Sequence, residues 1–123
     1  MTVRRAVVLT ADLLFGSNLR GALISSGYEV AITAEPVALR EQLAGEPSPT
    51  LLVDLTDEPL ERVAQVSALR EEGLLAGVAV LAYYSHVEAS VRDAALAAGF
   101  DLVVPRSRMA REAAELTAGV ARS

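Results

Sequence analysis

The chain has 123 residues, of which 52% are apolar and 4% aromatic, and it contains no cysteine. This length and composition predict one folded domain over residues 1–123, and the lack of cysteine excludes disulfides and thiolate chemistry. Its 16 acidic and 11 basic residues give a net charge of −5, which argues against a broad nucleic-acid-binding surface. No apolar run is long enough to span a membrane and the first residues do not form a secretory signal, so we expect a cytoplasmic protein.

The first segments alternate between strand and helix patterns. Arg5–Leu9 is a short apolar run, typical of a strand that is covered on both faces. Apolar residues at helical spacing then predict a helix from Leu13 to a glycine cap at Gly27, with Asp12 or Thr10 as its N-cap. The residues expected on the buried face of this helix are Phe15, Leu19, Ala22 and Leu23.

The second strand and helix follow directly. Tyr28–Thr33 alternates polar and apolar residues, which predicts a strand near the edge of a sheet. The next helix is expected to begin at Pro36 and to stop at Gly45. Glu46–Pro49 contains two prolines and predicts a stiff connector to the third strand.

Thr50–Asp57 is the stretch around which the chain is organised. Its apolar residues predict a buried strand that ends in Asp54, a side chain that is costly to bury without a partner. Residues 56–58 are expected to supply capping side chains for a helix over Pro59–Glu72, which ends at Gly73. The packed face of this helix is expected to contain Leu60, Val63, Val66 and Leu69.

The last part of the chain repeats the alternation twice. Gly77–Tyr83 predicts a fourth strand and Leu102–Val104 a fifth. The helix between them ends at Gly99, and a last helix follows Pro105–Ser107. The apolar faces of these helices are expected to contain Val87, Val91, Ala94, Ala95 and Ala98 in the first, and Met109, Ala113, Leu116 and Val120 in the second.

Strict alternation with short connections predicts a three-layer α/β domain, a parallel sheet with helices on both faces. In such open sheets, ligands bind beyond the carboxyl ends of the strands. Four segments are therefore expected to meet at one edge of the sheet: Thr10–Asp12, Asp54–Thr56, Tyr83–His86 and Pro105–Ser107.

Three features make the chain resemble the CheY-like receiver domain of bacterial response regulators. Asp54 ends the third strand as the phosphoacceptor aspartate of that family does. Ala97–Asp101 resembles the turn before the family's fifth strand, and Arg106 stands at the spacing from Asp54 where the family has an invariant lysine. The resemblance covers the whole chain and implies a flavodoxin-like fold with strand order 2-1-3-4-5.

The resemblance also implies a phosphorylation site. Asp54 would accept the phosphoryl group, and Mg²⁺ would be held by acidic residues after the first strand and by backbone near Thr56. By spacing, that acidic pair falls on Thr10 and Ala11, and the nearest acid is Asp12. The metal candidates are therefore Asp12, Asp54 and Thr56, and no other cofactor is expected.

Two further positions depart from the family pattern. The switch hydroxyl is expected near residues 82–84, and the nearest aliphatic hydroxyl is that of Ser85. Arg106 keeps the positive charge of the lysine but presents a planar fork, and is the charge-partner candidate. These changes favour an atypical receiver or pseudo-receiver, because losing one preorganised charge-stabilising group costs roughly 10² to 10³ in rate.

Each candidate also has a structural interpretation. Asp54 could cap the following helix or pair with Arg106, and Asp12 could be a helix cap instead of a metal ligand. The segment Tyr83, Tyr84, Ser85 and His86 could begin a helix, with Ser85 as N-cap. Alternatively it is a switch or interaction surface, because exposed aromatic residues often anchor interfaces.

Two hypotheses for function remain, with a third as a remote alternative. The first is a signalling module that binds a protein partner or forms a homodimer. The second is a stand-alone receiver that a histidine kinase phosphorylates on Asp54 with Mg²⁺. A small hydrolase that uses Ser85 and His86 is the remote alternative, since the Gly-x-Ser-x-Gly elbow is missing. No nucleic-acid or membrane partner is expected.

Overall fold

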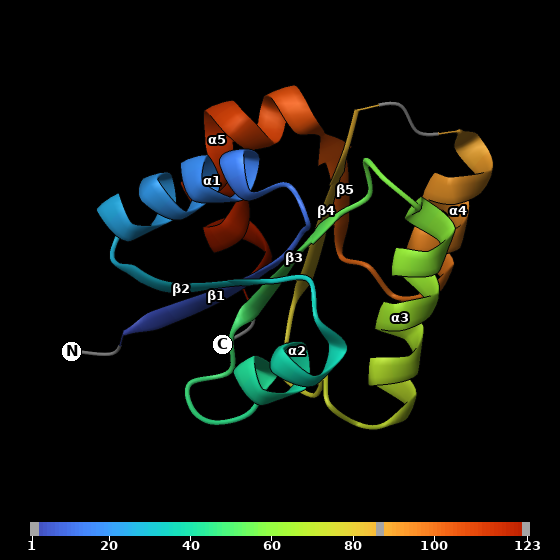
Figure 1. Cartoon of the computed structure of the whole chain (residues 1–123), viewed down its shortest axis with the longest axis horizontal. Coiled ribbons are helices and arrows are strands. Elements are labelled where there is room, and N and C mark those ends of the chain that lie inside the picture. The colour runs from blue at the N-terminus through green and yellow to red at the C-terminus, as the bar shows by residue number, and fades with distance from the viewer. Residues whose placement is uncertain (1–2, 86–87, 122–123) are drawn as a thin grey trace.

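The computed structural model describes residues 3–85 and 88–121. Within these residues, five parallel strands alternate with five helices, in the sheet order β2-β1-β3-β4-β5 (Figure 1). The predicted α/β class and strand order are therefore confirmed. The strands are β1 (Arg4–Leu9), β2 (Tyr28–Thr33), β3 (Thr50–Asp54), β4 (Val80–Tyr84) and β5 (Leu102–Pro105). The helices are α1 (Leu13–Ser25), α2 (Pro36–Leu43), α3 (Pro59–Glu71), α4 (Ala89–Ala97) and α5 (Arg106–Val120).

The sheet separates two helical layers, each with its own apolar core. Helices α1 and α5 cover one face, and α2, α3 and α4 cover the other (Figure 1). Side chains of β1 alternate between the two cores, with Ala6 and Val8 on the α1 and α5 side and Val7 and Leu9 on the opposite side. Because helices cover the sheet on both sides, both faces of β1 are buried, as its continuous apolar sequence predicted.

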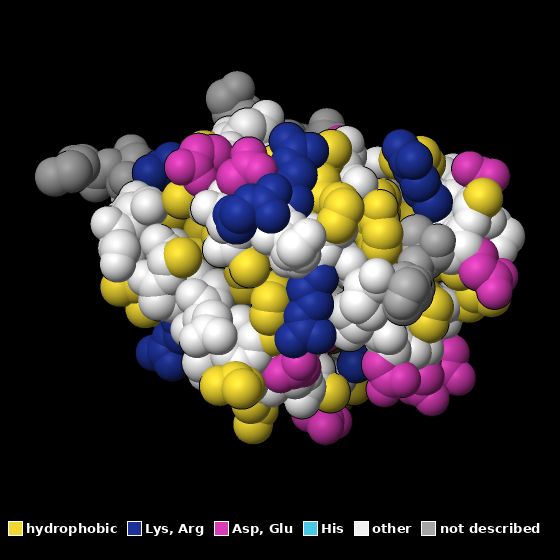
Figure 2. Space-filling model, turned by 90° about the horizontal axis from the view of Figure 1, so that it is seen from above, with side chains coloured by type: hydrophobic (Ala, Val, Ile, Leu, Met, Phe, Trp, Pro, Cys, Tyr) yellow, Lys and Arg dark blue, Asp and Glu magenta, His cyan; other side chains and the backbone are white. Residues whose placement is uncertain are grey.

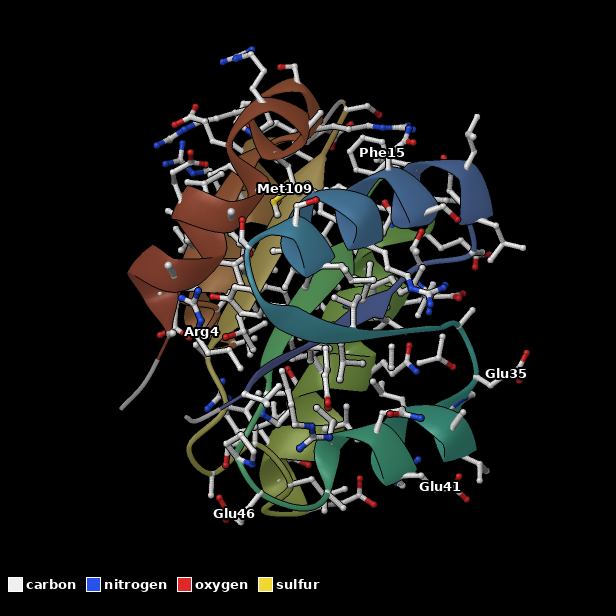
Figure 3. All side chains as sticks on the ribbon, turned by 90° about the vertical axis from the view of Figure 1, so that its left-hand side faces the viewer. Arg4, Phe15, Glu35, Glu41, Glu46 and Met109 are labelled. Carbon is white, nitrogen blue, oxygen red and sulfur yellow. The ribbon has the colours of Figure 1, made fainter. Side chains whose placement is uncertain are left out.

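The contact between α1 and α5 closes the first of these cores. Phe15, Leu19 and Leu23 recur every fourth residue along α1 and are all buried. They form one core with Met109, which Figure 3 shows beside α1, and with Leu116 of α5. Burying one side chain of this size stabilises the fold by roughly 1.5–3 kcal/mol.

Several local predictions about the helices were wrong. Ala22 is exposed, because the buried stripe of α1 follows Phe15, Leu19 and Leu23. Leu60 is 59% exposed, since it lies in the first turn of α3, at the end of that helix next to the rim of the sheet. The N-cap of α3 is Glu58, which has φ 47° and makes no side-chain cap hydrogen bond.

The start of α4 also differs from the sequence interpretation. Its N-cap is Glu88, with extended backbone, and the helix begins at Ala89. Ser85 is therefore not the N-cap of this helix. His86 and Val87, which the sequence interpretation placed at the helix start and on its apolar face, lie outside the described residues.

None of the helices in residues 3–85 and 88–121 is both long enough and apolar enough to cross a lipid bilayer.

Candidate functional site at the carboxyl edge of the sheet

Strand register brings the ends of three strands together. Leu9 of β1 pairs with Val53 of β3, and Asp54 pairs with Tyr83 of β4. Thr10 follows Leu9 and therefore lies next to Asp54 at the carboxyl edge, where parallel sheets place their sites. Asp54 is only 7% exposed, so its carboxylate needs partners within the protein.

Two threonines supply those partners. Thr10 Oγ1 donates to Asp54 Oδ2 at 2.6 Å. On the other oxygen, Oδ1, Asp54 accepts hydrogen bonds from the backbone N–H of Thr56 at 2.8 Å and from the Thr56 hydroxyl. Both carboxylate oxygens are thus held by short hydrogen bonds to donors that carry no charge. The Thr56 hydroxyl donates to Asp54 and is therefore not available to cap α3, contrary to the prediction from the sequence.

Asp12 is the N-cap of α1. Of the two residues predicted for this role, Asp12 and Thr10, the structure has Asp12. Its Oδ1 accepts from the backbone N–H of Phe15 at 3.0 Å, and its Oδ2 accepts from Arg106 at 3.0 Å. The hydrogen bond from Phe15, reinforced by the Arg106 guanidinium, holds the pKa of Asp12 below its ordinary value. The alternative that Arg106 pairs with Asp54 was wrong, because its ion pair in the structure is with Asp12.

An aromatic stack fixes the position of Arg106. Its guanidinium carbon lies 4.1 Å from the ring centroid of Phe15. The Phe15 ring in turn contacts Tyr83, with centroids 5.1 Å apart and planes at 44°. A planar guanidinium can lie on a ring and bind a carboxylate at the same time, which a lysine ammonium does less well. Phe15 was predicted only as a core residue, and its place under Arg106 was missed.

Tyr83 and Tyr84 point to opposite environments, as neighbours on a strand do. Tyr83 is fully buried, and its hydroxyl has no hydrogen-bond partner among the described residues. Burial, and next the negative charge of Asp54, raise the pKa of Tyr83 far above its ordinary value. Tyr83 is therefore part of the core and cannot contact a partner directly.

Tyr84 is half-buried and lies between two surface pockets. One pocket, of about 390 Å³, separates it from the start of α5 and includes Phe15, Ser85 and Arg106. The other, of about 480 Å³, separates it from α4 and includes Arg92 and Leu96. Ser85 is exposed in the first pocket. His86, the last member of the predicted segment, lies outside the described residues.

A third pocket, of about 280 Å³, opens beside Asp54. It is lined by Ala11, Asp12, Asp54, Thr56, Asp57 and Arg62. Seen from above the carboxyl edge, acidic and basic side chains are interspersed and no broad basic patch is visible (Figure 2).

The donor set beside Asp54 does not fit Mg²⁺. This ion needs several oxygen ligands in near-ideal octahedral geometry, with carboxylates that are free to bind it. Here the two oxygens of Asp54 accept hydrogen bonds from Thr10 and Thr56, and Oδ2 of Asp12 is paired with Arg106. The described residues contain no group of three or more acidic or histidine side chains arranged for a metal.

Solved structures share this architecture at low sequence identity. A response regulator from Thermotoga maritima superposes with a TM-score of 0.81 at 16% identity, covering 96% of this chain and 97% of that one. A CheY-like receiver domain protein from Methanospirillum hungatei gives 0.80 at 18%, covering 96% and 93%. The receiver domain of a response regulator from Mycobacterium tuberculosis gives 0.77 at 19%, covering 97% and 96%.

The sequence comparisons add no family assignment. No protein-family model matches the chain, and no curated protein matches it. The structural likeness extends over nearly the whole chain, with the same order of five parallel strands and the same alternation of helices. The chain therefore has the flavodoxin-like fold of CheY-like response regulator receiver domains.

Proposed function

We propose that this chain, over residues 1–123, is a receiver-like signalling module that acts by binding other proteins, with Asp54 as a structural carboxylate. The single observation that carries the proposal is the hydrogen bond from Thr10 to Asp54 Oδ2. At the position of a metal-binding acid in the receiver resemblance, this chain has a neutral hydroxyl donor. The receiver fold supports the signalling role, and the changed residues support a role without phosphoryl transfer.

The charge arrangement supports this proposal. A carboxylate that attacks phosphorus needs a free oxygen and nearby cations that neutralise the phosphoryl oxygens. The charge of Arg106 is already offset by Asp12, and its guanidinium lies on the Phe15 ring. We expect the loss of these preorganised groups to slow phosphorylation by roughly 10² to 10³ for each group.

Intact-mass measurement after incubation with acetyl phosphate and Mg²⁺ tests the proposal. We expect no added phosphoryl group on the native chain. The matched variant is Thr10→Asp with Ala11→Asp, which restores the acidic pair and is expected to gain phosphorylation. An added phosphoryl group on the native chain that disappears in Asp54→Asn would overturn the proposal.

A phosphorylatable stand-alone receiver is the second candidate. The pocket beside Asp54 favours this candidate, because Asp54 lines a pocket of about 280 Å³ that has room for a small phosphodonor. In that case a histidine kinase would be the donor and Mg²⁺ would have to displace Thr10 from Asp54. An amide-shift titration with Mg²⁺ separates the candidates: saturable shifts at Asp12, Asp54 and Thr56 favour the receiver.

Tyr84 is the proposed contact for a protein partner or for a second copy of the chain. It is half-buried and has a pocket on each side, a setting in which an aromatic side chain can anchor an interface. The double variant Tyr84→Ala with His86→Ala is expected to lose association, measured by sedimentation and by quantitative co-purification. Because Tyr84 packs partly against the core, the Tm of the variant is expected to fall by about 3 °C. A much larger fall would mark these residues as packing residues.

We infer a non-catalytic protein that works in the cytoplasm. A hydrolase built on Ser85 and His86 gains no support, since the carboxylate that would orient the histidine, Asp54, is held by Thr10 and Thr56. The net charge of −5 supports the absence of a nucleic-acid partner. Mass measurement after exposure to p-nitrophenyl acetate tests for an acyl-enzyme on Ser85, and none is expected.

A further inference from the structure

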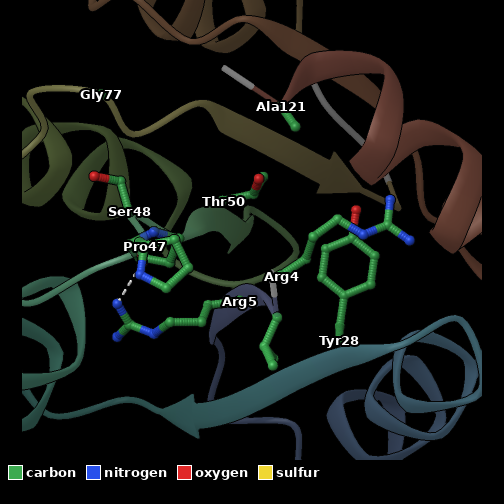
Figure 4. A pocket seen from close by; sticks show the side chains of 10 residues that line it. Arg4, Arg5, Tyr28, Pro47, Ser48, Thr50, Gly77 and Ala121 are labelled. Atoms are coloured by element: carbon green, nitrogen blue, oxygen red, sulfur yellow. Dashed lines mark hydrogen bonds between the residues drawn. The ribbon is translucent and has the colours of Figure 1, made fainter. Parts of the chain in front are cut away.

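A pocket of about 280 Å³ lies at the amino edge of the sheet, at the opposite end of the strands from Asp54 (Figure 4). Segments far apart in the sequence form its walls. They are the starts of β1 and β2, the connector before β3, the turn before β4 and the residue after α5. Its lining is mainly apolar and includes Val3, Tyr28, Pro47 and Pro49.

Two consecutive arginines bring positive charge to this apolar pocket. Arg4 places its guanidinium carbon 4.4 Å from the ring centroid of Tyr28 and donates to the carbonyl oxygen of Ser26 at 2.9 Å. Arg5 donates to the carbonyl oxygens of Pro47 at 2.7 Å and Gln42 at 2.6 Å. The Arg5 contact with Pro47 is the dashed line in Figure 4.

No carboxylate within residues 3–85 and 88–121 forms an ion pair with Arg4 or Arg5. Among the described residues, the ion pairs involve Arg40, Arg106, Arg108 and Arg111, and the partners of Arg4 and Arg5 are neutral carbonyls. The described residues that line the pocket include no carboxylate, so an anion there would gain charge-assisted hydrogen bonds from the arginines.

The pocket is held open by contacts that are already formed. The Tyr28 ring supports Arg4, and the two carbonyls fix Arg5. A close approach at Gly77 shapes another wall: its φ is +76°, and a Cβ there would lie 3.2 Å from Ser48 Oγ. A preformed site loses less entropy on binding than one that must be ordered.

We propose that this pocket binds a compact organic anion, with a carboxylate on Arg4 and an apolar body against Tyr28 and the prolines. Arg5 contributes its positive charge while its hydrogen bonds hold the wall. The volume lies just below the range of about 300–1,000 Å³ for drug-sized ligands, which selects a small molecule. This inference does not depend on the proposed signalling function, because the site lies at the opposite edge of the sheet.

Amide-shift titration of the full chain tests the site, with benzoate and hexanoate as probes and benzamide as the neutral match of benzoate. We expect saturable shifts at Arg4, Tyr28, Thr50 and Gly77 with at least one carboxylate, and none at Thr56. Benzamide is expected to bind about tenfold or more weakly, because it lacks the charge.

Matched arginine variants distinguish specific binding in this pocket from nonspecific attraction of anions to any surface arginine. Arg4→Gln is expected to weaken carboxylate binding about tenfold, whereas Arg20→Gln, an exposed arginine of α1 outside the pocket, should leave it unchanged. The proposal is overturned if neither carboxylate saturates below about 10 mM, if benzamide binds as well as benzoate, or if the two variants behave alike.

Discussion

The Thr10 hydroxyl donates to Asp54 Oδ2 at 2.6 Å and so joins the ends of β1 and β3. The same Thr10 oxygen accepts the backbone N–H of Asp12 at 2.9 Å. One neutral side chain thus satisfies a buried carboxylate and orders the turn into α1. At this position a second carboxylate would repel Asp54 unless a cation lay between them. The hydroxyl removes the need for that cation.

Replacing Thr10 with valine tests the importance of this hydrogen bond for stability. Thr10→Val keeps the shape of the side chain but leaves Asp54 Oδ2 without its donor. We expect a loss of about 1–3 kcal/mol in the free energy of unfolding, measured by urea denaturation. Thr33→Val is the control, since the Thr33 hydroxyl accepts an exposed backbone N–H and its loss should cost less than about 1 kcal/mol. Equal losses in both variants would contradict this role of Thr10.

The pKa of Asp12 reports how much helix capping and the ion pair with Arg106 each stabilise the Asp12 carboxylate. The backbone N–H of Phe15 is the largest cause of its lowered pKa, and Arg106 adds to the effect. Arg106→Gln should therefore raise the pKa of Asp12 only part of the way to its ordinary value, as measured by carboxyl NMR titration. The pKa of Asp12 is lower in the folded state than in the unfolded state. Ionised Asp12 therefore stabilises the fold above its unfolded-state pKa, and this stabilisation is lost as the pH falls through its folded-state pKa. A full return in Arg106→Gln would show that capping has little effect.

Glu58 is held in an unfavourable backbone conformation. Its φ of 47° lies in the left-handed region, and its side chain caps nothing. Repulsion from Glu61, then their mutual hydrogen bond and the charge of Asp57, raise the pKa of Glu58. Glu58→Ala removes the charge, and Glu58→Gly also removes the left-handed strain.

We therefore expect Glu58→Gly to be more stable than Glu58→Ala by about 1 kcal/mol, measured by urea denaturation at pH 7. The pKa of Glu58 is higher in the folded state than in the unfolded state, so the ionised carboxylate destabilises the fold. This destabilisation grows as the pH rises from the unfolded-state pKa through the folded-state pKa. The stability gain in both variants should accordingly shrink as the pH is lowered. A glycine variant no more stable than the alanine variant would argue against strain at this position.

Three buried hydroxyl groups have no hydrogen-bond partner among the described residues: those of Tyr28, Tyr83 and Thr117. Tyr83 and Thr117 are the two that are fully buried. Tyr83→Phe and Thr117→Val remove these groups with little change in shape. We expect each variant to be at least as stable as the native chain, with a gain of up to about 1 kcal/mol in urea denaturation. A loss above that size would show that the hydroxyl has a bonding partner, such as a buried water.

Local signals in the sequence located the elements of this fold, although β4 begins at Val80 and not at the predicted Gly77, which has a left-handed φ of 76°. The bounds of β2 and β3, the start of α2 at Pro36 and the place of Asp54 at a strand end all agree with the sequence prediction. Each depends on short-range properties: the alternation of apolar residues, the fixed φ of proline and the cost of burying a charge. Asp12 as a helix cap is equally local, since its partner is three residues away.

Contacts between distant segments were decided only by the tertiary structure. Arg106 pairs with Asp12 instead of Asp54 because α5 begins beside the Phe15 ring, 94 residue positions from Asp12 in the chain. Tyr83 is buried because α1 and α5 cover its face of the sheet, whereas Tyr84 lies on the opposite face and is only partly covered. The sequence alone located Asp54 at a strand end, but packing supplied Thr10 as its partner, since hydrogen bonds across a sheet depend on register and not on local pattern.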